Sequence, residues 1–256
     1  DPAWSPDALR LAYASNKDGN WEIYIYDLLA NQTTRMTFNL AFDANPAWSP
    51  DSNWLVYETY QGGTLDVYVL PVTDANASLE PITLDASADF SPAWSPTGRD
   101  ITFVSWRDGR QDIYVVSLDD VSVVRNVTDT VERHEDYPAW SPDGRRLAYS
   151  ALDGGIEKVF VRSLDSLDAP PEVIGAGRAP SWSPDGRAIV AAVDTLDATH
   201  LTVYPYEGAG VPQIISVPPR ANSPTWSALP LPASLVSAGG LPLQASALYI
   251  EQETAF

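Results

Sequence analysis

The sequence predicts an all-β fold, a six-bladed β-propeller with four antiparallel strands in each blade and an incomplete sixth blade. The first observation is a Trp-containing motif that occurs six times, at spacings of 44, 46, 46, 42 and 44 residues. The second is an apolar–aromatic pair that follows each motif Trp at a nearly constant distance. The third is the content of 22 Pro and 15 Gly, which leaves little room for long helices. A repeat of about 40–45 residues with short strands is typical of a propeller blade.

The motif copies divide residues 1–256 into repeats that begin near residues 2, 46, 92, 138, 180 and 224. Four copies read Pro-Ala-Trp-Ser-Pro, the fifth reads Pro-Ser-Trp-Ser-Pro, and the sixth is degraded to Pro-Thr-Trp-Ser-Ala. The motif tryptophans are Trp4, Trp48, Trp94, Trp140, Trp182 and Trp226. The aromatic residues of the second mark are Tyr24, Tyr68, Tyr114, Phe160, Tyr204 and Tyr249. Because both marks keep their register along the chain, we interpret residues 1–256 as one propeller domain.

Each repeat predicts four strands. The motif Trp ends a short first strand, and Ser-Pro-Asp-Gly at 141–144 and 183–186 has the residues of a type I turn. The second strand is an apolar run such as residues 100–104, and the third contains the Ile-Tyr mark. The fourth is an outer strand such as residues 124–128. One such sheet alone would expose two apolar faces, so blades must stack with Trp and Tyr filling the space between them.

These motifs resemble the TolB-type propeller repeat, also called PD40 (WD40-like), whose pattern is Pro-x-Trp-Ser-Pro-Asp-Gly, then Ile-Ala-Phe, then Asp-Ile-Tyr. The resemblance covers the whole chain and is best in the first four repeats, although Ala8, Ser52 and Thr97 alter the turn. It implies an exported or periplasmic scaffold that binds other proteins or envelope components. The same repeat also occurs in propellers that guard the active sites of prolyl-oligopeptidase-like and tricorn-like proteases.

Composition and net charge limit the classes of partner that the protein can bind. The formal net charge of −19 repels phosphate backbones, so we expect no nucleic-acid partner. No apolar run has membrane-spanning length, and the chain has no Cys for disulfides or thiolate metal sites. No motif predicts a cofactor or a metal site. Sequons at Asn31, Asn76 and Asn126 favour a secreted, periplasmic or cell-surface protein.

The ends of the chain predict an open ring. The chain begins Asp1-Pro2, with no Met and no signal peptide, which indicates a piece processed or excised from a longer protein. The sixth repeat reaches Tyr249 and stops at Phe256, before an outer strand can form. We expect residues preceding Asp1 to supply the closing strand. Without it, the edge near Tyr249 invites strand exchange with another molecule.

A set of charged residues is predicted at the mouth of the central channel. Asp43, Asp89 and Glu135 stand three positions before the motif Pro in consecutive repeats, with Asp136 beside the last. Repeats five and six have Arg178 and Arg220 near that place. Such a mouth could hold a cation, an amine or a charged peptide terminus. Alternatively, the carboxylates cap loops and bond backbone amides of the neighbouring blade.

Two tryptophans lie outside the repeat pattern. Trp21 and Trp106 fall in or beside the loop between the second and third strands, on the same face as the channel mouth. An exposed loop Trp is a candidate hot spot for partner binding, and packing against a neighbouring loop is the alternative. His134 and His200 also fall in loops of that face, without metal-ligand spacing, and we interpret them as surface histidines.

The sequence therefore predicts a non-enzymatic binding propeller that presents one loop face and the channel mouth to a protein, peptide or envelope component. The alternatives are a metal-dependent hydrolase or lyase that uses Asp43, Asp89 and Glu135, and the gating propeller of a protease. The fold permits all three, because function depends on the site that a fold supports.

Overall fold

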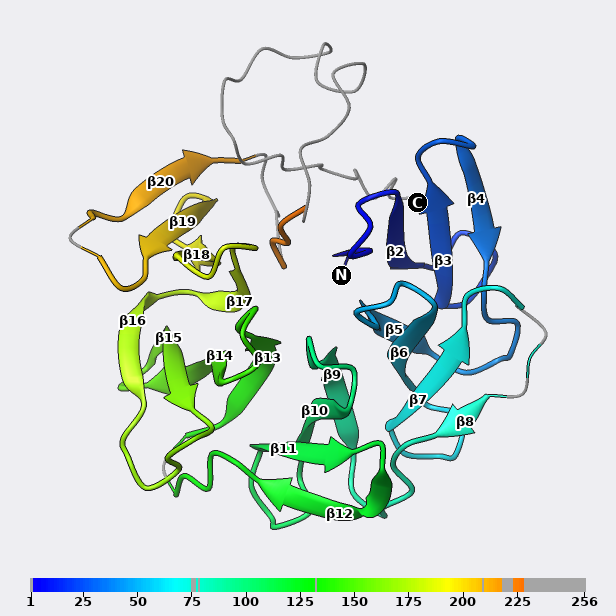
Figure 1. The fold of residues 1–256 in the computed structure, drawn as a ribbon, viewed down its shortest axis with the longest axis horizontal. Helices are drawn as coiled ribbons and strands as arrows, with labels where there is room; N and C mark the ends of the chain where they lie inside the picture. The colour runs from blue at the N-terminus through cyan, green and yellow to red at the C-terminus, as the bar shows by residue number, and fades with distance from the viewer. Residues whose placement is uncertain are drawn as a thin grey trace.

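The computed structural model describes residues 2–74, 77, 79–131, 133–208, 210–217 and 223–227. This part of the chain forms five four-stranded antiparallel sheets arranged as blades around a common centre (Figure 1). The all-β prediction and the four-stranded blades are confirmed. The structure has five blades rather than the predicted six, because residues 228–256, which make up most of the sixth repeat, lie outside the described residues.

The strands follow one another in sequence order within every blade. Blade one contains β1 (Ala3–Trp4), β2 (Arg10–Ser15), β3 (Glu22–Asp27) and β4 (Gln32–Arg35). Blade two contains β5 (Asp43–Trp48), β6 (Trp54–Thr59), β7 (Asp66–Pro71) and β8 (Glu80–Pro81). Blade three contains β9 (Asp89–Trp94), β10 (Asp100–Ser105), β11 (Asp112–Ser117) and β12 (Asp120–Asn126). Blade four contains β13 (Glu135–Trp140), β14 (Arg146–Asp153), β15 (Ile156–Ser163) and β16 (Glu172–Ala176). Blade five contains β17 (Arg178–Trp182), β18 (Ala188–Asp194), β19 (Thr199–Pro205) and β20 (Gln213–Ser216).

Both sequence marks lie where the repeat predicts them. The motif Trp is the last residue of the first strand in each of the five blades, and the apolar–aromatic pair lies in the third strand. The first strands are innermost and the fourth strands are on the outside of the ring (Figure 1). Every blade therefore repeats one path from the centre outward.

The hydrophobic core lies between blades, because each sheet is apolar on both faces. Between blades one and two, Trp48 packs with Ile23, Met36 and Tyr57. Equivalent clusters lie between blades two and three, three and four, and four and five. The motif indole also donates a hydrogen bond across the interface: Nε1 of Trp48 to the carbonyl oxygen of Ala3 at 2.9 Å. Trp140 and Trp226 repeat this bond to Ala93 and Ser181, which precede the motif Trp of other repeats.

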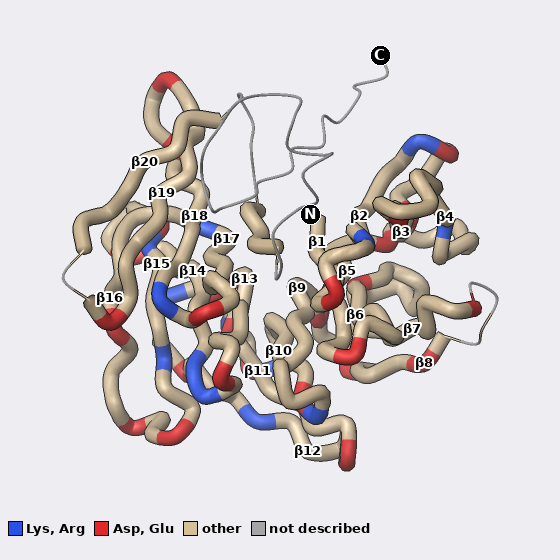
Figure 2. Tube along the Cα trace, turned by 45° about the horizontal axis from the view of Figure 1, so that its top comes forward, with Lys and Arg blue, Asp and Glu red and all other residues tan. Residues whose placement is uncertain are grey.

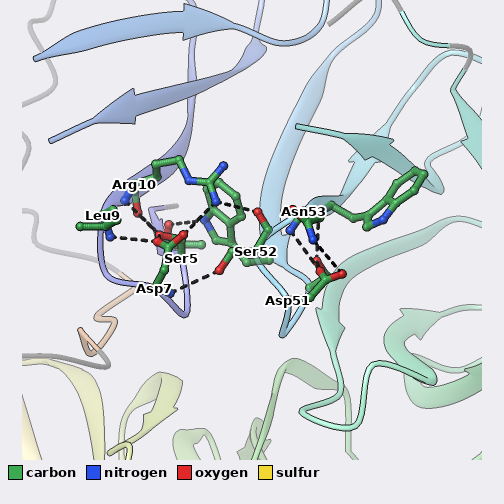
Figure 3. Close-up of polar contacts among 11 residues, drawn as sticks. Ser5, Asp7, Leu9, Arg10, Asp51, Ser52 and Asn53 are labelled. Atoms are coloured by element: carbon green, nitrogen blue, oxygen red, sulfur yellow. Dashed lines mark hydrogen bonds and ion pairs between the residues drawn. The ribbon is translucent and has the colours of Figure 1, made fainter. Parts of the chain in front are cut away.

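The Ser-Pro-Asp turn is a self-contained hydrogen-bonded unit. In blade one, the Ser5 hydroxyl donates to Asp7 at 2.5 Å and accepts the backbone N–H of Arg10 at 3.0 Å (Figure 3). Asp7 in turn accepts the backbone N–H of Leu9. The Ser-to-Asp bond recurs in blades two, four and five, and Thr97 takes the place of Asp in blade three. The motif Ser and Asp are therefore required by the turn.

The turns also join neighbouring blades. Arg10 donates to the carbonyl oxygen of Ser52 at 2.7 Å and lies over the ring of Trp48 (Figure 3). In later blades the fourth turn residue is Gly at positive φ, and at Gly98 an added Cβ would lie 3.3 Å from Pro50 of the preceding blade. Ala8 and Ser52 adopt the same left-handed conformation at this position without being Gly. These contacts fix the angle between neighbouring blades.

The start of the sixth repeat lies where the other repeats place theirs. A cavity of about 160 Å³ at the centre of the ring is lined by the motif prolines of all six repeats. These are Pro2, Pro46, Pro92, Pro138, Pro180 and Pro224. Trp226 packs with Val190 and Leu201 on the face of blade five that is opposite its interface with blade four.

Two matched substitutions test the indole bond between blades. Trp48 and Trp182 are equally buried, but Nε1 of Trp182 has no hydrogen-bond partner among the residues that the structure describes. Trp48→Phe loses ring area and a hydrogen bond, whereas Trp182→Phe loses ring area and removes an unsatisfied donor. We expect Trp48→Phe to reduce the free energy of unfolding by about 1 kcal/mol more than Trp182→Phe, measured by urea denaturation. Equal losses would show that the indole bond adds nothing.

Candidate functional site

Two sets of loops emerge on one face of the ring, here called the loop face. They are the loops between the second and third strands and the connections that lead into the next blade, because successive strands alternate in direction. Backbone bonds join them: the N–H of Asp43 donates to Trp21 at 3.0 Å, and the N–H of Glu135 donates to Gln111 at 3.1 Å. The opposite face, here called the turn face, carries the Ser-Pro-Asp turns and the hairpins between third and fourth strands.

Exposed apolar side chains gather on the loop face. Ten of the eighteen exposed large apolar residues of the described chain lie on its loops or the strand ends beside them. They are Phe38, Leu40, Phe42, Tyr60, Leu84, Trp106, Val131, Leu152, Ile156 and Leu196. The turn face has Leu9, Leu29, Trp54 and Val211, and the other four lie on outer strands. The loop face is therefore the more apolar end of a strongly acidic protein.

The two additional tryptophans differ in exposure. Trp106 is 40% exposed and its ring lies 5.4 Å from that of His134, which is also exposed. Trp21 is half-buried and packs against Phe42 at 6.3 Å between ring centroids. Both alternatives of the sequence analysis thus occur, with Trp106 presented to solvent and Trp21 mostly packed. We refer to Trp106, Val131 and His134 as the Trp106 patch.

The predicted acidic residues lie inside the blade interfaces. Asp43, Asp89 and Glu135 are fully buried at the starts of β5, β9 and β13, so they do not face an open channel mouth. Asp43 accepts a hydrogen bond from Asn39 at 2.8 Å, and Asp89 accepts one from Arg107 at 3.0 Å. Glu135 accepts one from the Thr130 hydroxyl at 2.5 Å. These contacts correspond to the loop-capping alternative of the sequence analysis.

Each buried acid has an acidic counterpart in the preceding blade that sequence reasoning missed. The counterparts are Glu22, Asp66 and Asp112, all at most 4% exposed, at the starts of β3, β7 and β11. The negative charges of Glu22 and Asp112 act on Asp43 and Glu135, and the charge of Asp89 acts on Asp66. The available signal was the acidic residue directly before the apolar–aromatic mark in each of the first three repeats. We call these three sets the interblade acid pairs.

Burial changes the protonation of these pairs. Loss of solvent raises the pKa of Asp43 and Asp89 above the usual aspartate range. Burial raises the pKa of Glu135 to about 7, with a further contribution from the charge of Asp112. Several oxygens at these sites have no hydrogen-bond partner in the described part of the chain, among them Asp43 Oδ1 and Tyr57 Oη.

A different group of residues lines the central cavity. The residue before the motif Pro has positive φ in every repeat from the second to the sixth: Asn45, Ser91, Tyr137, Ala179 and Ser223. Behind them, the Ser91 N–H donates to Glu58 at 2.8 Å and its hydroxyl donates to Asp136 at 2.7 Å. Burial raises the pKa of both Glu58 and Asp136. Asp136 and Glu58 thus both bond Ser91 of the cavity wall, and the sequence did not reveal Glu58.

Of the two basic residues predicted at the channel mouth, the structure describes one. Arg178 begins β17 and pairs with Asp194 at 3.0 Å and with Glu157 at 3.7 Å. Arg220 lies outside the described residues. His200 lies in β19 rather than in a loop. Acidic residues are spread over all five blades (Figure 2), and among the described residues no group of three or more His, Asp or Glu could hold a metal ion.

The fold and the repeated interface define a β-propeller protein built from four-stranded blades. Residues 1–83 match the family model described as TolB beta propeller domain, PD40. A stretch of 36 residues is 50% identical to the Protein TolB homolog of Protochlamydia amoebophila (strain UWE25), over 14% of this chain and 8% of that protein. The resemblance to TolB-type PD40 propellers that the motifs indicated is therefore confirmed.

Solved structures agree with this at the level of the fold. TolB from Acinetobacter baumannii superposes with a TM-score of 0.77 and 22% identity, over 89% of this chain and 56% of that one. TolB from Agrobacterium tumefaciens gives a TM-score of 0.64 and 24% identity, over 81% and 74%. Oligogalacturonate lyase from Vibrio parahaemolyticus gives 0.56 and 13%, over 88% and 82%. The chain thus spans little more than half of the Acinetobacter structure. No helix among the described residues has the length and apolarity to cross a membrane.

Two aspartates should respond to substitution with opposite signs. The raised pKa of Asp43 means that its ionisation opposes folding, increasingly as pH rises above the unfolded-state value. Asp43→Asn removes this charge, and its new N–H can donate to the unpartnered oxygen of Tyr57 or Thr59. We expect Asp43→Asn to raise Tm at pH 7.5 and to lose this advantage as pH approaches 4.

The control is Asp143, whose pKa is lowered mainly by the hydrogen bond from Ser141. Its ionised form stabilises the fold at neutral pH, and this contribution is lost as pH falls below about 4. We expect Asp143→Asn to reduce the free energy of unfolding at pH 7.5 by up to about 1 kcal/mol. Thermal unfolding of both variants across pH 4–8 measures the two signs, and destabilisation by Asp43→Asn would contradict the analysis of the acid pairs.

Proposed function

We propose that this chain is a protein-binding propeller that uses its loop face as the contact surface. The observation that carries the proposal is the concentration of exposed apolar side chains on that face. Exposed apolar patches on a soluble protein mark interaction sites, and aromatic residues dominate the energy of such contacts. A protein or peptide partner fits this chemistry, with an envelope component as the class that the TolB resemblance implies.

The charge distribution supports the same face. Residues 36–42 and 60–65, which form two of its loops, contain no charged residue in a chain of net charge −19. A partner with an apolar surface can approach these loops without desolvating a carboxylate. The turn face differs, because four of its five Ser-Pro turns contain an Asp. The uncharged loops therefore lower the electrostatic cost of binding on the loop face.

The enzyme alternatives have less support. A metal-dependent hydrolase or lyase would need Asp43, Asp89 and Glu135 to face a substrate, and all three are fully buried. The lyase similarity is a likeness of fold at 13% identity. A gating propeller of a protease would use the channel, whose centre narrows to a cavity of about 160 Å³ lined by the six motif prolines. The contact geometry favours the binding function over both alternatives.

We further propose that the complete ring has six blades and that the protein is exported. The sixth blade is supported by Pro224 in the cavity wall and by Trp226, whose indole bonds Ser181 as Trp48 bonds Ala3. Export is supported by the sequons and by the periplasmic location that the TolB resemblance implies. Asn31 lies exposed between β3 and β4.

Site-specific photocrosslinking tests the binding face. The photoreactive residue p-benzoylphenylalanine replaces Trp106 in one variant and Trp54, on the turn face, in the other. The two native side chains are 40% and 41% exposed, so the variants differ in face and not in accessibility. In the source cells we expect a discrete protein crosslink from position 106 and none from position 54.

A crosslink from position 54 alone, or equal labelling at both positions, would contradict the proposal. Matched circular dichroism spectra and Tm values establish that both variants are folded. A third variant at Leu196, which is fully exposed on the loop of blade five, reports how far the contact extends around the loop face. A partner that binds the whole face crosslinks there as well.

A further inference from the structure

The Trp106 patch stands on two loops that meet at one buried acid pair. The loop of residues 106–111 leads into Asp112, and the connection of residues 127–134 leads into Glu135. The loops are joined directly, because Glu135 N–H donates to Gln111 O and the Gln111 side chain donates to Glu135 O, both at 3.1 Å. Any change at this pair therefore acts on both supports of the patch.

Threonine 130 connects the two acids across the interface. Its backbone N–H donates to Asp112 Oδ1 at 3.1 Å, and its hydroxyl donates to Glu135 Oε1 at 2.5 Å. Both carboxyl groups are fully buried, and each has one oxygen bonded to the same Thr130. Glu135 Oε2 has no other partner in the described part of the chain. Two carboxyl groups in this arrangement can bond each other when one of them carries a proton.

The surrounding charges do not neutralise a doubly ionised pair. The nearest cation from the loop is Arg110, whose Nε lies 4.0 Å from Asp112 and whose other end pairs with Asp129 at 3.1 Å. From the connection, Arg133 pairs with Asp153, and His134 contacts Trp106 at the surface. From blade four, Tyr149 and Arg162 face the pair, and Arg162 donates to the Leu167 carbonyl.

The other interfaces are arranged differently. Glu22 has Arg35 at 2.6 Å and Asp89 has Arg107 at 3.0 Å, so each of those acid pairs contains a close cation. Between blades four and five, Lys158 and Gly177 stand where the acids would be. The Asp112–Glu135 pair is thus the one of the three interblade acid pairs without a cation in close contact.

We propose that Glu135 retains a proton and donates it in a hydrogen bond to Asp112, and that this proton holds the two loops of the Trp106 patch together. When the proton is released to solvent, two negative charges face each other across the interface and the contacts through Thr130 and Gln111 weaken. The patch is therefore ordered at mildly acidic pH and loosens as the pH rises through neutrality. The inference rests on the proposed function only in making the patch a binding surface, and it makes that surface responsive to pH.

The raised pKa of Glu135, about 7, is consistent with this range. The sign follows from linkage: the folded state holds the proton more tightly than the unfolded chain does. The stabilising contact is therefore complete below about pH 4.5 and is lost as pH rises through about 7.

Hydrogen exchange followed by mass spectrometry tests the proposal without a partner. The quantity is the protection factor of peptides covering residues 106–111 and 127–134, corrected for the intrinsic pH dependence of exchange, at pH 6.0 and 8.5. We expect protection in the native chain to fall by about tenfold or more, the change that one pKa unit of coupling gives. Glu135→Gln, which donates to Asp112 at every pH, should stay protected at both values. His134→Asn removes the neighbouring imidazole and leaves the acid pair intact, so a fall in protection that persists in this variant comes from the acid pair.

Constant protection in the native chain, or the same fall in Glu135→Gln, would overturn the proposal. If Glu135→Gln fails to fold, the side-chain carboxyl carbon of Glu135 in the native chain gives the answer by ¹³C NMR. A titration midpoint near 7 supports the retained proton, and a midpoint below about 5 excludes it. Both readouts are independent of photocrosslinking at position 106, so failure of the proton and failure of the binding face are distinguishable.

Discussion

The structure depends on burying the two apolar faces of each sheet against neighbouring blades. Each core cluster draws residues from two consecutive blades, so no blade has a core of its own. The motif Trp contributes the largest side chain to this packing, and its indole N–H fixes its orientation by bonding a carbonyl of another repeat. Since every interface places a motif Trp and an apolar–aromatic pair at equivalent positions, successive blades pack in a similar way and a ring results.

Most of the fold could be predicted because its constraints repeat. The position of Trp48 at the end of a strand, the Ser-Pro-Asp turn and the Ile-Tyr mark in the third strand each occur in several copies, and a repeated pattern separates constraint from chance. The sixth repeat was weaker because its turn lacks Asp and Gly. For the same reason the sequence could not establish how the ring closes at Tyr249.

The candidate site was less predictable, because the sequence does not show whether a charged side chain is buried or exposed. Asp43, Asp89 and Glu135 were placed on the correct end of their strands, but the sequence could not show that side chains on this register point between blades. Their counterparts Glu22 and Asp112 were overlooked, since a carboxylate before an apolar strand resembles an ordinary surface residue. Only three-dimensional packing brings residues 22 and 43, or 112 and 135, together.

The turn face and the loop face are under different structural constraints, and this affects where a binding surface can form. On the turn face, Ser5, Asp7 and Arg10 are committed to holding their own turn and the next blade, so substitution there disturbs blade spacing. On the loop face, backbone bonds at Asp43 and Glu135 and side-chain bonds such as that of Gln111 hold the loops, and the exposed apolar side chains take no part in them. Side chains such as Leu40 and Trp106 are therefore free to vary, and a binding surface can form there without cost to the fold. The Asp112–Glu135 pair lies in the interface between blades three and four, directly below the two loops that carry the Trp106 patch. A single proton at this pair can therefore affect both the blade interface and the exposed loops.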